Sequence, residues 1–334
     1  MKRLVLLCFG CIALLGVDRA ARSSDIAALV LEAKIPLGSV RGRIDHLAVD
    51  VRRSRLYVAE LGNDSIGVVD LKDRKLVRTL TGFREPQGIA FDSITDAVFI
   101  ANGGDGTVRK LSASDWSQMA EIDLGDDADN VRIDGPMHRA FVGYGDGALA
   151  MIDTASFKLM SSVKLHGHPE SFQLEPAGPR IYINIPDAHT IAVVDRGAGE
   201  EIARWSTPGM SANFPMAIDQ SKQTVISVFR SPPVMASFNM KDASTDMALP
   251  TCADADDVFL DSKRHRIYVV CGEGVIDVFA ERGHTYSLVS KTKTVPGART
   301  GLYSAELDQL FIAVRATANE PAAIWSFRPS GAME

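Results

Sequence analysis

The sequence has few aromatic residues, few cysteines and no excess of positive charge. Aromatic residues occupy 7% of the 334 positions, and the formal net charge is −6. Nucleic acids and anionic membrane surfaces select for basic protein faces, so this charge balance argues against both as partners. A hydrophobic content of 46% with 23% charged residues is typical of a chain that folds into a globular structure.

Familiar catalytic and cofactor-binding motifs are absent as well. The sequence contains no GKS/T, GxSxG, HExxH or CxxCH motif. Residues 102–107 and 143–147 are rich in Gly, but expected strands flank them on both sides, whereas a phosphate-binding loop requires a following helix. We therefore predict that these segments are hairpin turns, and we assign no cofactor with certainty.

No hydrophobic run reaches the length of a membrane span. Residues 4–17 are apolar, follow the basic pair Lys2 and Arg3, and have the length of a signal-peptide core. We predict a cleavable signal peptide over residues 1–23. Cys8 and Cys11 fall inside this leader, so we do not expect a redox or haem site there. The mature product is predicted to be periplasmic or secreted, without a membrane span, and monomeric.

The sequence does contain a repeat of about 42 residues. Each unit opens with an alternating apolar segment that ends in an acid or a serine, and the centre of a second apolar segment follows seven residues later. The residues that end the first segments are Asp50, Asp92, Asp134, Glu175, Asp219, Asp261 and Ser304. The centres of the second segments are Tyr57, Phe99, Phe141, Tyr182, Ile226, Tyr268 and Phe311. Four short strands per unit, joined by Gly and Asp turns, are typical of a propeller blade.

Seven units predict an all-β fold, a single seven-bladed β-propeller of four-stranded blades. The blades are expected at residues 43–82, 86–125, 128–167, 169–209, 213–252, 255–294 and 298–329. The last unit contains only three strands, and an unassigned strand lies at residues 28–38. We predict that this N-terminal strand completes the last blade and closes the ring, because closure hides both free sheet edges. The propeller then spans residues 28–329.

The second strands carry a family resemblance. Arg55–Glu60, Ala97–Asn102 and residues 266–270 resemble the Tyr-Val-Thr-Asn repeat, and residues 86–92 strengthen the match. The whole mature chain is similar to the exported YVTN-repeat, YncE-like propellers, which belong with the WD40-like repeat proteins. The resemblance implies seven blades and bacterial export. It implies no single activity, because propellers host many functions.

A binding site is expected at one mouth of the central channel. The first strand of each propeller blade lines that channel, so residues at the start of these strands gather at one end. Acids dominate this position, five residues before the end of each first segment. The predicted binding residues are Asp45, His46, Gln87, Asp129, Asn130, Arg132, His168, Glu170, Asp256, Asp257 and Arg299. We expect a small molecule or a protein segment to bind at this acidic mouth.

The same residue types allow other roles. Asp and Asn favour turns before strands, because their side chains hydrogen-bond nearby backbone N–H groups. Carboxylates also bind divalent cations, and the candidate ligands for Ca²⁺ or Zn²⁺ are Asp45, Asp129, Glu170 and Asp256, with His46, His166 and His168 as nitrogen donors. Arg132 lies in an otherwise apolar strand and is expected either to pair with Asp129 or Glu170 or to hold an anionic ligand.

Cys252 and Cys271 are the two cysteines of the mature chain. The register of the repeat brings both to the same mouth of blade six, and an oxidising compartment favours a disulfide between them. A free thiol pair acting in redox chemistry or binding a soft metal, and two unlinked thiols, are the alternatives.

Two functions of different classes follow from these residues. The first is a binding or interaction protein with its ligand at the acidic mouth. The second is a metal-dependent hydrolase similar to the propeller lactonases and gluconolactonases, in which a cation polarises a carbonyl and activates water. A quinone-dependent dehydrogenase is a weaker third option, because the sequence shows no clamp for that cofactor.

Overall fold

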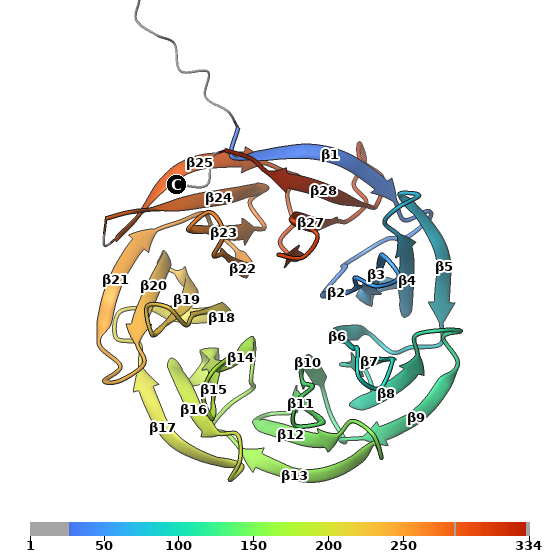
Figure 1. Cartoon of the computed structure of the whole chain (residues 1–334), viewed down its shortest axis with the longest axis horizontal. Coiled ribbons are helices and arrows are strands. Elements are labelled where there is room, and N and C mark those ends of the chain that lie inside the picture. Colours follow the sequence, from blue (N-terminus) through green and yellow to red (C-terminus); the bar gives the residue numbers. More distant parts are fainter. Residues whose placement is uncertain (1–26, 284, 332–334) are drawn as a thin grey trace, which may run out of the picture.

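Seven four-stranded antiparallel sheets form a closed ring in the computed structural model, which describes residues 27–283 and 285–331 (Figure 1). The predicted all-β propeller of seven blades is therefore confirmed. The predicted signal peptide, with Cys8 and Cys11, lies outside the described residues. No helix in the described ranges is long and apolar enough to cross a membrane.

The first four blades follow one another along the chain. Blade 1 contains β2 (Leu47–Asp50), β3 (Arg55–Glu60), β4 (Ser65–Asp70) and β5 (Lys75–Thr81). Blade 2 contains β6 (Pro86–Asp92), β7 (Ala97–Asn102), β8 (Thr107–Ser112) and β9 (Gln118–Asp123). Blade 3 contains β10 (Ala128–Asp134), β11 (Arg139–Tyr144), β12 (Ala148–Asp153) and β13 (Lys158–Lys164). Blade 4 contains β14 (Phe172–Leu174), β15 (Arg180–Ile185), β16 (Thr190–Asp195) and β17 (Glu200–Ser206).

The remaining three blades complete the circle. Blade 5 contains β18 (Ser211–Asp219), β19 (Thr224–Ser231), β20 (Pro233–Asn239) and β21 (Thr245–Pro250). Blade 6 contains β22 (Ala255–Asp261), β23 (Arg266–Cys271), β24 (Val275–Arg282) and β25 (Thr285–Lys293). Blade 7 contains β26 (Gly301–Ser304), β27 (Gln309–Val314), β28 (Ala323–Pro329) and β1 (Leu29–Pro36). The described chain adds two short 3₁₀ helices, η1 (Leu61–Asn63) and η2 (Pro186–Ala188).

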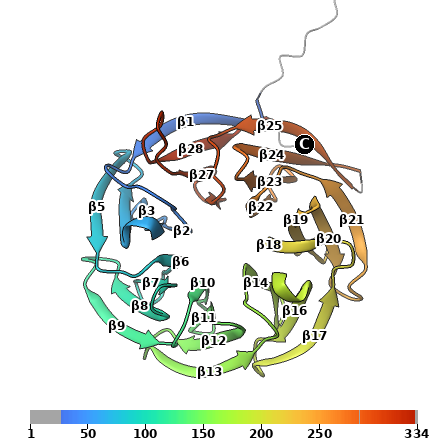
Figure 2. The same cartoon turned by 180° about the vertical axis from the view of Figure 1, so that it is seen from behind.

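The N-terminal strand β1 closes the ring, as the sequence predicts. It pairs antiparallel with β28 from Leu29 opposite Pro329 to Pro36 opposite Ala323, and both figures show it at the rim of the ring, outside β28 (Figure 2). An irregularity in register separates Leu31 from Ala33. All six other blades have a similar irregularity between their third and fourth strands. Strand β1 therefore reproduces the geometry of a fourth strand, including the added twist that a bulge gives to a strand pair.

The core lies between neighbouring blades. The aromatic centres of the second strands are almost fully buried, and Tyr57 and Tyr268 are 1% and 0% exposed. Tyr57 packs with Ile89 and Val98 of the next blade, and Tyr268 packs with Leu310 and other residues of blade 7. Burial of a large side chain of this kind contributes roughly 1.5–3 kcal/mol. The repeat thus supplies one apolar layer per blade, and each layer holds two sheets together.

The acids that end the first strands stabilise turns at the bottom face, which we define as the face where the first strands end. Asp50 accepts a hydrogen bond from the Arg53 backbone N–H at 3.2 Å and pairs with its guanidinium at 2.7 Å. Arg53 also pairs with Asp96 of the next blade at 2.7 Å. The same arrangement recurs where Arg264 joins Asp261 to Asp308. These acids are structural, and the top face, where the first strands begin, remains available for the candidate site.

Candidate functional site

Four acids from different blades line one cavity at the top face. Asp45 precedes β2, Asp129 lies in β10, Glu170 precedes β14 and Asp256 lies in β22, so blades 1, 3, 4 and 6 each supply one carboxylate. The cavity has a volume of about 20 Å³ and is also lined by Arg43, His46, Asn130, Ser171 and Phe214. We call it the acidic cavity. Its volume suits one water-sized group, such as an ammonium.

Bulges in the first strands explain why neighbouring residues share this cavity. Ala128 pairs with Tyr144 and Val131 pairs with Val142, so Asp129 and Asn130 together lie opposite a single residue of β11. In β22 the register also shifts, between Ala255 and Asp257, around Asp256. A regular strand sends successive side chains to opposite faces, whereas a bulge re-aims one of them. Asp129 and Asn130 can therefore both line the acidic cavity.

Three of the four carboxylates have cationic partners. Asp45 Oδ2 lies 2.9 Å from Arg43 Nη2, and Asp129 Oδ2 lies 3.8 Å from His168 Nε2. Asp256 pairs with Arg299 Nε at 2.8 Å and also with Arg230. These contacts place Arg299 and His168, both predicted site residues, beside the cavity.

Two acceptors of the acidic cavity lack a partner of this kind. The Glu170 carboxylate forms no ion pair and no side-chain hydrogen bond within residues 27–283 and 285–331. Asn130 is 2% exposed, and its buried Oδ1 has no hydrogen-bond partner in the described chain. A buried acceptor without a donor costs about 1–3 kcal/mol. This cost applies to Asn130 Oδ1, while Glu170 is partly exposed and adds an unpaired carboxylate, so the cavity favours a group that brings hydrogen-bond donors.

Burial shifts the protonation of the acids at this mouth. It raises the pKa of Asp45 to about 6, although His46 and Arg43 oppose the shift. Burial and the charge of Asp129 raise the pKa of Glu170 to about 7. Burial raises the pKa of Asp257 to about 7, against the opposing charge of His46. A cation bound beside these groups would favour their charged forms and lower these pKa values.

His168 has the opposite behaviour. Burial opposes its charged form, but the Asp129 carboxylate and the Gly145 carbonyl outweigh burial and raise the pKa of His168 to about 9. Its Nδ1 lies 2.7 Å from the Gly145 carbonyl oxygen and its Nε2 faces Asp129. Both ring nitrogens thus face acceptors, which is the environment of an imidazolium.

The other predicted site residues lie nearby with different partners. Gln87 donates from Nε2 to Asp127 Oδ1 at 2.9 Å, and Asp257 Oδ2 accepts the Gly301 N–H at 2.7 Å. Arg132 makes no ion pair with Asp129 or Glu170. The expected pairing is wrong because its guanidinium lies over the Phe172 ring at 5.5 Å and donates to the Val131 carbonyl at 2.9 Å.

Sequence reasoning missed Arg43 and Arg230. Arg43 lies in the irregular connection before β2, and Arg230 lies near the end of β19, where its guanidinium rests 3.7 Å from the Phe214 ring centre. The end of a second strand returns to the top face, and this rule placed Cys271 correctly. Applied to every blade, the rule could have found Arg230.

The predicted disulfide is confirmed. Cys252 and Cys271 are bonded, with their Cα atoms 5.9 Å apart. The bond joins the connection that precedes β22 to the end of β23. The Gly272 N–H donates to the Asp254 carbonyl at 2.8 Å in the same loop. The segment that carries Asp254 and Asp256 is therefore anchored at both sides.

The candidate metal ligands share the acidic cavity without forming a metal cluster. Within the described part of the chain, no group of three or more His, Cys, Asp or Glu residues has an arrangement that could hold a metal ion. His166, a further candidate, pairs with Glu201 at 3.6 Å and does not line the acidic cavity. The charges of Asp45, Asp129 and Asp256 are instead compensated by side chains of the protein.

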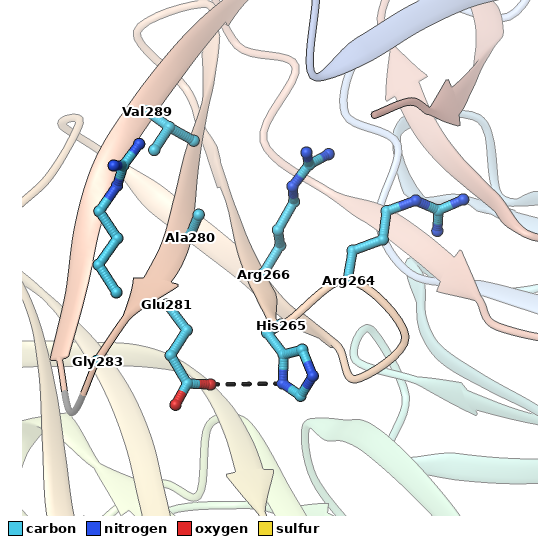
Figure 3. A pocket seen from close by; sticks show the side chains of 8 residues that line it. Arg264, His265, Arg266, Ala280, Glu281, Gly283 and Val289 are labelled. Carbon is cyan, nitrogen blue, oxygen red and sulfur yellow. Dashed lines mark ion pairs between the residues drawn. The ribbon is translucent and has the colours of Figure 1, made fainter. Parts of the chain in front are cut away.

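A larger cavity, of about 550 Å³, opens at the bottom face of blade 6 (Figure 3). Its lining includes Arg264, His265, Arg266 and Glu281, and His265 Nδ1 lies 3.4 Å from Glu281 Oε2. Two of its three arginines already have structural partners: Arg264 pairs with Asp308, and Arg266 donates to the Ser330 carbonyl at 2.5 Å. Arg282, the third, forms no ion pair within the described residues. None of the predicted site residues lines this cavity.

Comparison with known proteins identifies the fold. No family model matches the sequence, and no curated protein matches it. Hydrazine synthase from Kuenenia stuttgartiensis is similar in structure, with a TM-score of 0.76 and 15% identity over 89% of this chain and 97% of that chain. A chain of the crystal structure of the mitotic checkpoint complex has a TM-score of 0.76 and 10% identity, over 97% of this chain and 98% of that chain. The chain is a seven-bladed β-propeller, a fold that hosts many different functions.

Proposed function

We propose that this chain is an exported binding protein whose acidic cavity holds the cationic group of a ligand. The observation that carries the proposal is the buried, unpartnered Asn130 Oδ1 in a cavity lined by four carboxylates, of which Glu170 forms no ion pair within the described residues. An ammonium group brings three donors and a positive charge, so it would satisfy both acceptors at once. Fixed sites of this kind are pre-organised, which limits the entropy lost on binding.

Two further elements belong to the same proposal. The Cys252–Cys271 disulfide supports an oxidising compartment, and the predicted signal peptide would direct the chain to the periplasm or outside the cell. The YVTN-like second strands support kinship with exported YVTN-repeat propellers. Both elements place the binding site where it would meet small extracytoplasmic molecules or segments of other exported proteins.

Methylammonium chloride is the simplest probe of the cavity. A ligand-observed NMR titration of the mature protein should give saturable binding, with sodium chloride as the ionic-strength control. The Glu170→Gln variant should weaken binding by roughly tenfold, because a hydrogen bond to a charged group contributes about 1.5–3 kcal/mol. Asp187→Asn is the matched control, since Asp187 is an exposed acid in η2 at the same face. Equal binding by all three proteins would contradict the proposal.

Metal analysis separates this proposal from the hydrolase alternative. The protein is purified without chelator, and its Ca²⁺ and Zn²⁺ content is measured. About one tightly bound ion per chain, lost when Asp129 and Asp256 are both changed to Asn, would favour a metal-dependent hydrolase and direct the next assays to lactones. Ammonium binding by metal-free protein would favour the binding protein.

A further inference from the structure

A second cavity lies beside the acidic cavity and has the opposite charge. It has a volume of about 80 Å³ and lies where blades 1, 6 and 7 meet at the top face. Three guanidinium groups and one carboxylate line it, from Arg43, Arg299, Arg315 and Asp254. We call this cavity the arginine pocket. It contains none of the four carboxylates that line the acidic cavity.

The three arginines differ in how their charge is compensated. Arg43 pairs with Asp45 at 2.9 Å, and Arg299 pairs with Asp254 at 2.9 Å and with Asp256 at 2.8 Å. Arg315 forms no ion pair with any residue in the described ranges. Arg315 is exposed, so its guanidinium adds a hydrated positive charge without a carboxylate partner at the edge of the pocket. A planar guanidinium binds a carboxylate through two parallel hydrogen bonds, which makes an oxyanion the best complement.

Gly297 leaves room for the Arg315 guanidinium. A Cβ atom at position 297 would meet the guanidinium, and the backbone φ of +84° is one that side chains other than Gly rarely adopt. The Gly297 N–H also donates to the Gly272 carbonyl at 2.6 Å, which fixes this turn against the loop of blade 6. The backbone of Gly297, which has no side chain, thus forms one wall of the pocket, and the Arg315 guanidinium lies against it.

Arg43 joins the two cavities. Its side chain lines both the acidic cavity and the arginine pocket. Arg299 connects them as well, because it lines the arginine pocket while its Nε pairs with Asp256 of the acidic cavity. The acidic cavity, which suits a positive group, and the arginine pocket, which suits a negative group, are therefore neighbours separated by the side chains of Arg43 and Arg299.

From this geometry we propose that the arginine pocket binds the carboxylate of a small zwitterion whose ammonium group occupies the acidic cavity. The ligand class is an amino acid or a related amino carboxylate. The ammonium half rests on the proposed function, whereas the carboxylate half rests on the arginine pocket alone. Joining two groups in one molecule raises the effective concentration of the second group, so the zwitterion should bind more tightly than either fragment.

The experiment compares fragments with zwitterions by ligand-observed NMR titration of the mature protein. The probes are methylammonium, acetate, and the series glycine, β-alanine, 4-aminobutanoate and 6-aminohexanoate, in which the separation of the two charges increases. The best amino carboxylate should bind at least about tenfold more tightly than acetate or methylammonium.

Variants assign each half of the ligand to its cavity. Arg315→Gln should weaken acetate and the amino carboxylates by roughly tenfold and leave methylammonium unchanged. Gly297→Ala keeps the charge but displaces the guanidinium, so it should have the same selective effect. Arg78→Gln, at an exposed arginine of β5, is the matched control and should change nothing. Circular dichroism melting curves check that each variant is folded.

The outcomes separate this inference from the proposed function. Methylammonium binding without acetate binding would overturn the arginine pocket and leave the proposed function standing. Acetate binding that Arg315→Gln abolishes, without methylammonium binding, would overturn the zwitterion and the proposed function together. Amino carboxylates that bind no better than the fragments would show that the two cavities act separately, and this too would overturn the inference.

Discussion

His168 Nε2 lies 3.8 Å from Asp129 Oδ2, while the other ring nitrogen contacts the Gly145 carbonyl oxygen at 2.7 Å. Histidine and carboxylate come from consecutive blades, so the pair joins blade 3 to the connection that precedes blade 4. The imidazole of His168 is therefore charged at neutral pH in the folded protein, because its pKa is raised to about 9.

The His168–Asp129 pair predicts a loss of stability in alkali. The unfolded chain titrates at the ordinary pKa of His, about 6.5, so the stabilisation is complete below that pH and disappears as the pH rises through 9. Urea denaturation at pH 6 and pH 9.5 should show a decline of about 2–3 kcal/mol that the His168→Gln variant lacks. A parallel decline in both proteins would contradict the assignment.

Asp257 predicts a loss of stability in a lower pH window. Its pKa is raised to about 7 by burial, against about 4 for an unfolded Asp, so its contribution to folding becomes less favourable as the pH rises from 4 to 7. Asp257→Asn keeps an acceptor for the Gly301 N–H without the titration. The variant should therefore gain on the order of 2–4 kcal/mol relative to the parent between pH 4 and pH 7.5, measured by urea denaturation. A constant difference across this range would exclude the raised pKa.

The disulfide predicts sensitivity to reductant. The bonded cysteines are separated by 19 positions, and a loop of this size gives a stabilisation of about 3 kcal/mol. Unfolding is measured in guanidinium chloride. A phosphine reductant should lower the denaturant concentration at the unfolding midpoint of the parent protein to the value of the Cys252→Ala/Cys271→Ala double variant. The double variant itself is the control and should not respond. A parent protein that is insensitive to full reduction would contradict this account.

Ring closure predicts that β1 contributes to global stability. Ile35 pairs with Ile324 and is 1% exposed, whereas Val30 of the same strand is 45% exposed. Ile35→Ala should cost about 2–5 kcal/mol, and Val30→Ala should cost less than about 0.5 kcal/mol. Urea denaturation followed by tryptophan fluorescence measures both, and equal effects would indicate that β1 is only loosely attached.

The sequence predicts the architecture because the repeat encodes it at two fixed positions per blade. The acids Asp50 and Asp261 cap turns, and the aromatic centres Tyr57 and Tyr268 fill the layers between blades. Any residue whose position follows the repeat could therefore be located, including Cys252 and Cys271. Strand β1 could be assigned because blade 7 otherwise lacks its fourth strand.

The details of the site depend on features outside the repeat. Arg43 lies in the irregular connection before β2, so no periodic position predicts it. Arg315 directly follows β27, at the end of a second strand, so the rule that finds Arg230 would also have found Arg315. Asp129 and Asn130 share a cavity only because β10 carries a bulge. Arg132 follows the repeat, but its choice of Phe172 over a carboxylate depends on how closely blades 3 and 4 approach. The sequence therefore predicts which end of the channel carries the site, but not which side chains pair with one another there.

The pairing of β1 with β28 also sets an order of assembly. Leu29 and Pro329 are paired neighbours in the folded protein, although nearly the whole chain separates them. During synthesis β1 emerges before the other described strands, whereas β28, with which it pairs, is the last of them to appear. The six blades between them can form as each is completed, since domains and repeats fold as their segments become available. Strand β1 therefore stays unpaired until β28 is available, so closure of the ring requires that all seven blades have been made.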